Sequence, residues 1–406
     1  MSREVWLNLS CLSRIFSSRV AKKIFAAAAP HSICGNDKIT SASLQIPMAK
    51  LKTIKKPPTN QPINNQPETD APKSLGEYEQ STPGQLELFS FLQPQEKNYS
   101  NTIELYDFMP KYHWGKVKRV NGKFLDSLER QFECRGKRYR VNIQPASLTD
   151  KNGAEKYYYP SKREELVEDA LRRLVTAGQG LFLDEVAGVT FTLYQLQQEL
   201  KRNGHSYSTN ELKEALLICA KTNITVTSED GSAVLVSSLF ETLGLQSRED
   251  WKDKGERSKA FVRFNSLVTE SIKRGTFRQL NYEKAMSYRS VIARQLHKRM
   301  SHHYTQASIA HPYHILLSTI IRDFGLAQYD TPKHNLRNVK KAIDEMKTLD
   351  ILLNYKIEPT HDTANRNKFI DAKFILVPHP TFVGEVMQAN KRQGNISQFI
   401  AEDIKV

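Results

Sequence analysis

The sequence predicts an α+β protein in which two helix–helix–hairpin units follow a disordered N-terminal tail. Two observations lead to this prediction. Helix-start signatures occur in groups along residues 103–388, and each group is followed by two short β-rich runs. Residues 55–84 are rich in Pro, Asn, Gln and Thr, so they cannot bury enough apolar surface to offset the entropy of ordering them. The length of 406 residues is sufficient for more than one domain.

The charge balance favours a polyanionic partner. The chain has 59 Lys and Arg against 44 Asp and Glu, a net charge of +15 (59 − 44), and a pI of about 9.4. Such an excess suits nucleic acid or an anionic membrane surface. No run approaches the roughly 18 apolar residues of a membrane span, so we expect no membrane partner.

The cysteines give no sign of a disulfide framework or a zinc site. Cys11, Cys34, Cys134 and Cys219 are scattered and form no C-x-x-C pair. We therefore expect a reducing, cytoplasmic location, no metal and no cofactor.

Residues 1–47 form a leader that belongs to neither unit. Acids are nearly absent there, and the serines and arginines around the apolar run 24–29 resemble a transit peptide. The alternative, which we favour, is that translation begins at Met48, whose segment MAKLKTIKKPP is a plausible basic start.

Residues 48–102 are predicted to be a disordered tail with one apolar pentapeptide, QLELF. Its members are Gln85, Leu86, Glu87, Leu88 and Phe89. Such a peptide in a flexible tail is typical of a ligand for another protein. The alternative is that this apolar stretch docks back onto the chain's own folded part through Phe91 and Leu92.

The first unit, residues 103–246, is predicted from its turns and helix starts. Residues 131–134 and 138–143 alternate around Arg135-Gly136, which indicates a hairpin. Three capping boxes then predict helices over about 161–177, 192–203 and 208–221: Ser161-x-x-Glu164, Thr192-x-x-Gln195 and Ser208-x-x-Glu211. Residues 224–227 and 233–236 form a hairpin around Asp230-Gly231.

The tip of this last hairpin is acidic because it carries Glu229 and Asp230. An acidic tip is badly placed to meet phosphate. We therefore assign the first unit mainly to self-association or architecture.

The second unit, residues 247–388, is followed by a C-terminal tail, residues 389–406. Residues 261–264 and the segment through Leu280 are predicted to be strands. A long helix should cover 283–304 and a short one 314–324, where Gly325 ends it. On the long helix we expect four cations to face outward: Arg289, Arg294, Lys298 and Arg299.

The helix predicted over 331–349 is the main candidate for a nucleic-acid contact. Thr331 is a natural N-cap and Pro332 a natural first helical residue. One face carries an apolar stripe at three- and four-residue spacing: Leu336, Val339, Ala342, Ile343 and Met346. The other face carries the candidate DNA-binding residues: Lys333, His334, Asn335, Arg337, Asn338, Lys340 and Lys341.

Two β-rich runs, 351–357 and 369–377, follow this helix and predict a hairpin. Its tip carries Arg366 and Lys368, which are candidates for contacts with the DNA backbone. Helix, turn, helix and hairpin make the winged-helix order, whose second helix enters the major groove with its N-terminal residues against the bases. We therefore predict two tandem winged helices, with double-stranded DNA held mainly by the second.

Two other site types are weaker interpretations. His302, His303, His311 and His314 suggest a metal site, but adjacent helical residues point about 100° apart, and no suitably spaced carboxylate lies nearby. A nicking enzyme needs two histidines flanking a hydrophobic residue on one strand, and His302-His303-Tyr304 lacks that alternation. We therefore expect no enzymatic activity.

Taken together, the chain resembles the plasmid replication initiators of the RepA family and, more loosely, the TrfA-type initiators. The resemblance covers roughly Tyr99 to Met387 and is one of architecture. QLELF is similar to the sliding-clamp-binding motif that TrfA-type initiators carry in their N-terminal tail.

The resemblance implies binding to repeated origin sequences (iterons), opening of AT-rich DNA, and recruitment of host helicase and initiator proteins. It also implies a monomer–homodimer equilibrium in a bacterial, DNA-associated protein. Base and phosphate contacts would fall on Lys333 to Lys341, and contacts with the bacterial sliding clamp on Gln85, Leu86, Leu88 and Phe89. The alternative is a winged-helix transcriptional regulator or autorepressor without a replication role, which would have no use for the clamp motif.

Overall fold

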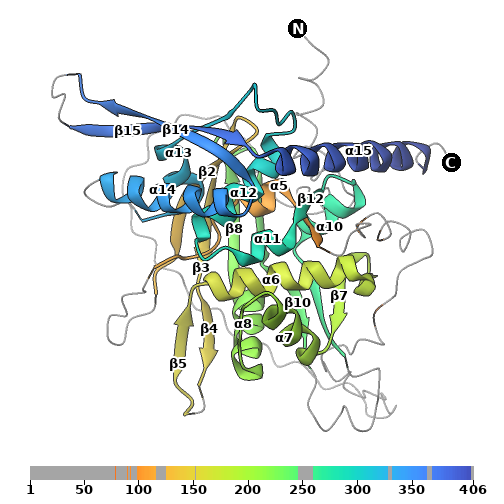
Figure 1. Cartoon of the computed structure of the whole chain (residues 1–406). Coiled ribbons are helices and arrows are strands. Elements are labelled where there is room, and N and C mark those ends of the chain that lie inside the picture. The colour runs from red at the N-terminus through yellow and green to blue at the C-terminus, as the bar shows by residue number, and fades with distance from the viewer. Residues whose placement is uncertain are drawn as a thin grey trace, which may run out of the picture. The chain divides into compact units, whose positions relative to one another are not determined.

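The computed structural model describes Tyr78, Phe89, Leu92 and residues 98–115, 125–150, 152–245, 259–327, 332–363 and 368–403. The leader 1–47 and nearly all of the tail expected over 48–102 lie outside these residues. The fold is α+β with two winged-helix units, as the sequence predicted (Figure 1).

The first winged-helix unit is built on three helices: α6 (Lys162–Leu174), α7 (Leu193–Arg202) and α8 (Thr209–Lys221). All three capping boxes are present, at Ser161, Thr192 and Ser208. Each box satisfies backbone N–H groups that the first helical turn leaves without a partner. The predicted helix starts are therefore confirmed.

A four-stranded antiparallel sheet completes this unit in the order β2-β3-β8-β9. Its strands are β2 (Leu128–Cys134), β3 (Lys137–Gln144), β8 (Asn223–Ser228) and β9 (Val234–Ser238). The turn between β2 and β3 needs positive φ at both central residues, and Arg135 and Gly136 have φ of 50° and 71°. Alternate side chains are buried, among them Phe132, Tyr139 and Val141.

Several strands here were not predicted. A hairpin of β4 (Ala146–Thr149) and β5 (Glu155–Tyr158) lies next to α8. A second sheet has the order β10-β11-β7-β6. Its strands are β6 (Gly180–Leu183), β7 (Val186–Phe191), β10 (Phe240–Gly244) and β11 (Ala260–Phe264), of which only β11 was expected.

Between α6 and β6, residues Val175–Gln179 form a π-helical turn. The segment after β11, expected to continue as strand, instead contains helix α10 (Ser266–Lys273). Asn265 caps α10 by accepting a hydrogen bond from the Leu267 N–H. Side-chain capping of this kind stabilises the helix over the extended alternative.

The second winged-helix unit has the predicted helix, turn, helix and hairpin, with one further strand and one helix divided in two. Its elements are α11 (Tyr282–Ser287), α12 (Val291–His303), β13 (Tyr313–Leu316), α13 (Leu317–Asp323), α14 (Pro332–Thr348), β14 (Leu352–His361) and β15 (Phe369–Pro378). The sheet order is β13-β15-β14. Figure 1 shows the β14–β15 hairpin, the wing, extending beside α14.

Two helices of this unit differ from the prediction. The helix expected over 283–304 is two helices, because the backbone of Tyr288 is extended and Ser290 then caps α12. The helix expected from His314 begins only at Leu317, since residues 313–316 pair with β15. A strand this short is decided by its partner rather than by its own sequence.

A long helix, α15 (Pro380–Asp403), follows the wing and covers much of the predicted C-terminal tail. Its buried residues include Phe382, Val386 and Ile396. Gly275 lets the helix approach closely, since a Cβ there would lie 2.3 Å from Cγ2 of Ile396. Residues that precede β2 also join this region: β1 (Tyr99–Thr102) pairs with β12 (Arg278–Asn281), and α5 (Glu104–Phe108) follows β1.

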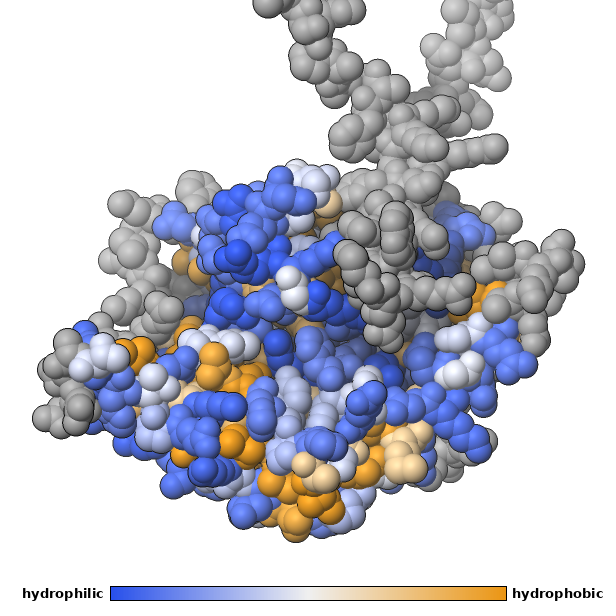
Figure 2. Space-filling view, turned by 90° about the horizontal axis from the view of Figure 1, so that it is seen from above, coloured by the Kyte–Doolittle hydropathy of each residue, from blue (hydrophilic) through white to orange (hydrophobic). Residues whose placement is uncertain are grey.

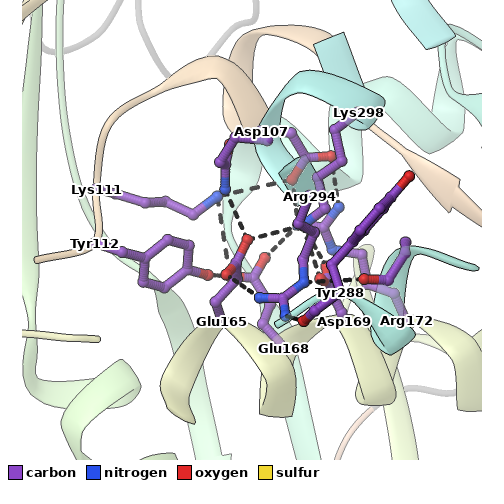
Figure 3. A network of polar contacts seen from close by, with 12 residues as sticks. Asp107, Lys111, Tyr112, Glu165, Glu168, Asp169, Arg172, Tyr288, Arg294 and Lys298 are labelled. Atoms are coloured by element: carbon purple, nitrogen blue, oxygen red, sulfur yellow. Dashed lines mark hydrogen bonds and ion pairs between the residues drawn. The ribbon is translucent and has the colours of Figure 1, made fainter. Parts of the chain in front are cut away.

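Eight buried charges fasten α6 to α5 and α12 (Figure 3). We call them the inter-unit ion network; they are Asp107, Lys111, Glu165, Glu168, Asp169, Arg172, Arg294 and Lys298. Arg294 of α12 lies 2.7 Å from Glu165 of α6, and Lys298 of α12 lies 2.7 Å from Asp169 of α6. Four carboxylates face four cations, so the charges balance.

The network corrects the expectation that the cations of α12 face solvent. Arg294, Lys298 and Arg299 are 0%, 3% and 7% exposed. Arg299 is paired with Asp323 at 2.9 Å. These three cations are buried and each is paired with a carboxylate. The pairing is needed because burying a charge without a partner would cost several kcal/mol.

Candidate nucleic-acid interface

Helix α14 presents the cationic face that the sequence predicted. Its stripe of Val339, Ala342, Ile343 and Met346 is fully buried against the core of the second unit. Lys333, Arg337, Lys340 and Lys341 lie on the opposite side and are exposed. The apolar stripe therefore fixes the rotation of the helix and turns these cations to solvent.

The acidic residues of α14 are used by the fold. The Glu345 carboxylate accepts hydrogen bonds from the N–H groups of Arg289 (2.6 Å) and Ser290 (3.0 Å), at the N-terminus of α12. Asp344 accepts one from the hydroxyl of Tyr355 in β14 at 2.8 Å. These bonds fix the C-terminal half of α14 against its neighbours.

The first half of α14 consequently carries uncompensated positive charge. Within the described residues, Lys333, Arg337, Lys340 and Lys341 make no ion pair. His334 contacts Arg337 at 3.3 Å, Nδ1 to guanidinium nitrogen. Unpaired cations at this end of a second helix are suited to phosphate and to base edges.

Asn335 differs from its neighbours because it is buried. Its side chain is 3% exposed and donates a hydrogen bond to the carbonyl of Ala327 at 3.1 Å. The bond ties α14 to the turn that follows α13. Asn335 therefore faces the protein. Besides the exposed cations, His334 and Asn338 of this half reach the surface, and both are half-buried.

A groove of about 1010 Å³ runs along the Asn338–Lys341 side of α14. Its far wall comes from residues before and within β2, among them Trp114 and Arg130. Trp114 donates to the carbonyl of Phe324 at 2.7 Å, and Arg130 donates to the carbonyls of Pro110 and Tyr112 at 2.7 and 2.6 Å. Hydrogen bonds therefore fix this wall. Asn338 and Lys341 line the opposite side of the groove.

The wing adds little net charge in its described part. Lys356, Lys368 and Lys373 are matched by Glu358, Asp362 and Asp371 over residues 352–363 and 368–378. Lys368 is exposed, 3.9 Å from the Asp362 carboxylate. Arg366, the other candidate at the tip, lies outside the described residues. The cationic character of this interface therefore comes mainly from α14.

The third helix of the first unit, α8, is less cationic than α14. Glu211 closes the capping box with Ser208, and Glu214 is paired with Arg163 at 2.7 Å. Lys213 and Lys221 are exposed. At the tip of the first wing, hydrogen bonds from Ser228 and Ser232 lower the pKa of Asp230 to about 2, so its carboxylate stays charged.

The candidate clamp-binding residues are only partly described. Gln85, Leu86 and Leu88 lie outside the described residues. Phe89 is 4% exposed, and its ring lies 4.9 Å from that of Phe182, centroid to centroid. The aromatic residue of the motif therefore packs on the chain's own first unit.

The histidines have structural neighbours. The ring of His302 is buried and hydrogen-bonded to the hydroxyl of Thr102 at 2.6 Å, and His303 lies 3.2 Å from Glu104. Among the described residues, no group of three potential metal ligands was found. None of the described helices is long and apolar enough to cross a membrane.

Figure 2 shows one face of the molecule, on which hydrophilic side chains predominate and apolar ones form patches between them. Among the described residues, the exposed large apolar side chains include Leu353 and Ile370 of the wing and Val236 of β9. Leu353 and Ile370 are 48% and 51% exposed.

No protein-family model matches the chain, and no curated protein matches it in sequence. Among solved structures, it is similar to domains 2 and 3 of RctB, with a TM-score of 0.39 and 10% identity over 64% of this chain and 94% of that one. A second structure of RctB domains 2–3 gives a TM-score of 0.38 and 11% identity over 66% and 96%. The Pi initiator protein, solved in complex with iteron DNA, gives a TM-score of 0.31 and 13% identity over 71% and 100%.

Proposed function

We propose that this protein is a non-enzymatic plasmid replication initiator that binds repeated origin sequences through its second winged helix. The observation that carries the proposal is the state of α14. Its apolar stripe is buried, its acids are bound by the fold, and four cations of its other face are exposed without an ion-pair partner in the described structure. A helix held in this way by the core of its unit is suited to the major groove of double-stranded DNA.

The exposed residues divide into two roles. Arg337 and Asn338 have the chemistry to read base edges, because Arg pairs with guanine and Asn with adenine through two hydrogen bonds. Lys333, Lys340 and Lys341 act as phosphate contacts, and Lys368 extends them from the wing. Asn335 is not part of this set because its side-chain amide is buried and donates a hydrogen bond to the carbonyl of Ala327.

The partners follow from the same proposal. Host helicase and initiator proteins would be recruited to the bound origin, and the bacterial sliding clamp would take the QLELF segment of the tail. A monomer–homodimer equilibrium would separate initiation from autorepression. These assignments are supported by the resemblance in motif and architecture.

The second candidate is a winged-helix transcriptional regulator without a replication role. The burial of Phe89 against Phe182 favours it, since a docked aromatic residue has a purpose without any clamp. The two candidates share DNA binding by α14. They differ in whether the DNA next to the bound site is replicated.

A mobility-shift experiment with DNA flanking the gene tests the shared step. If α14 and the wing meet about six phosphates, log affinity falls against log salt with a slope near −5. A flat salt response would contradict the electrostatic assignment. Plasmid maintenance then separates the candidates: an initiator supports replication of a plasmid carrying only that DNA, and a regulator does not.

A further inference from the structure

The first winged-helix unit holds the aromatic end of the QLELF segment. Phe89 is 4% exposed and packs at 4.9 Å against the ring of Phe182 in β6. Gly180 makes room for it, because a Cβ at that position would lie 2.7 Å from Cδ1 of Phe89. The contact therefore depends on an unsubstituted backbone position next to the receiving ring.

Residues on both sides of Phe89 are fastened as well. Leu92 is 2% exposed, and its carbonyl accepts a buried hydrogen bond of 2.9 Å from the side-chain amide of Asn101. Tyr78 is 8% exposed and lies edge-on to Phe261 of β11 at 5.2 Å, with the guanidinium of Arg263 5.3 Å from the centre of its ring.

The three anchors contact different places on the folded part of the chain. Phe182 and Phe261 belong to the same sheet, β10-β11-β7-β6, but the register places their side chains on opposite faces, because Phe182 pairs with Ala187 and Phe261 with Thr190 of β7. Leu92 is hydrogen-bonded to β1, which belongs to another sheet. The site that holds Phe89 is therefore formed by Phe182 and Gly180, and Tyr78 and Leu92 are separate attachments.

We infer that this docked tail is self-occluded: the first unit competes with any partner for Phe89, and the clamp takes the motif only after the tail is released. The inference rests on the proposed clamp contact, and it adds that the contact is regulated. One phenyl ring cannot fill the Phe182–Gly180 site and a partner's pocket at the same time. The apparent affinity for the partner equals the intrinsic affinity multiplied by the fraction of molecules in the released state, so a tenth released gives about tenfold weaker binding.

The test compares three forms of the motif on immobilised bacterial sliding clamp. They are a synthetic peptide of residues 80–93, the full chain, and the full chain with Phe182→Ala. We expect the full chain to bind at least tenfold more weakly than the peptide, and Phe182→Ala to recover most of the difference. Tyr194→Ala is the matched control, because this aromatic residue of the same unit is 68% exposed. It should leave the affinity unchanged.

Hydrogen exchange of the full chain provides a readout that does not involve the clamp. Amides of residues 89–92 should exchange more slowly than in the peptide, and Phe182→Ala should remove this protection while α14 remains protected. Retained protection of α14 shows that the variant is folded.

The outcomes separate the two ideas. If the peptide fails to bind, the clamp contact of the proposed function is wrong, and hydrogen exchange still decides whether the tail is docked. If the peptide binds and the full chain binds equally well, with residues 89–92 unprotected, the self-occlusion is refuted and the clamp contact stands.

Discussion

Removal of one cation from the inter-unit ion network should destabilise the whole protein. Lys298 is 3% exposed, and its ammonium lies 2.7 and 2.9 Å from the two carboxylate oxygens of Asp169 and 3.4 Å from Glu165. The variant Lys298→Met keeps the apolar stem and leaves two buried carboxylates with one cation fewer. Leaving a buried carboxylate without its cation lowers the free energy of unfolding by about 3–5 kcal/mol. Urea denaturation followed by circular dichroism measures the loss.

The double variant Lys298→Met/Asp169→Leu is the matched control. It removes one charge of each sign, so the remaining network is again balanced. Replacement of a buried pair by apolar residues is often neutral, and the double variant should therefore be more stable than Lys298→Met alone. A double variant whose loss equals the sum of the two single losses would show that the two side chains do not interact.

The single variant also has a predictable pH dependence. Burial raises the pKa of Asp169 above its ordinary value even in the intact protein, where Lys298 opposes that effect. Without Lys298 the folded-state pKa rises further. A carboxyl whose pKa is higher in the folded than in the unfolded state favours folding when protonated, so stability is lost as pH rises. The deficit of Lys298→Met relative to the intact protein should therefore be larger at pH 8 than at pH 5, and a constant deficit would refute the reasoning.

Two further predictions concern α14 and His302. Arg337→Ala should cost about 1–3 kcal/mol on the cognate repeat and little on random DNA, whereas Lys340→Ala should weaken both equally; titrations on the two DNAs distinguish these roles. Burial lowers the pKa of His302 from 6.5 to about 4, so the unfolded chain binds this proton first and stability falls as pH drops from about 6.5 towards 4. His302→Gln should reduce that fall by up to about 3 kcal/mol in denaturation at pH 4.5 against pH 7.5; an unchanged pH profile would contradict it.

The sequence predicted the elements whose signals are local. The capping boxes of α6, α7 and α8 and the apolar stripe of α14 are each contained within one helix, so they could be found without knowledge of the fold. The same is true of the hairpin turn at Arg135-Gly136. The α14 cations follow directly, because a buried stripe determines which residues lie opposite.

Features that depend on distant partners could not be predicted. Arg294 and Lys298 of α12 were expected at the surface, but the carboxylates that pair with them in the interior lie 129 residues away on α6. Asn335 was expected to face DNA, but its acceptor is a carbonyl in the preceding turn. β13 and β6 are short strands determined by pairing, and their sequences carry little periodic signal of their own.

The balance of the inter-unit ion network determines how the protein responds to salt. Since its eight charges cancel, the surplus of 15 positive charges lies on the rest of the chain (59 − 44 = 15). Mobile ions screen exposed cations strongly and buried pairs far less. If α14 binds DNA as proposed, concentrated salt should release the DNA while the two winged helices remain joined, and the folded protein could then be purified free of nucleic acid.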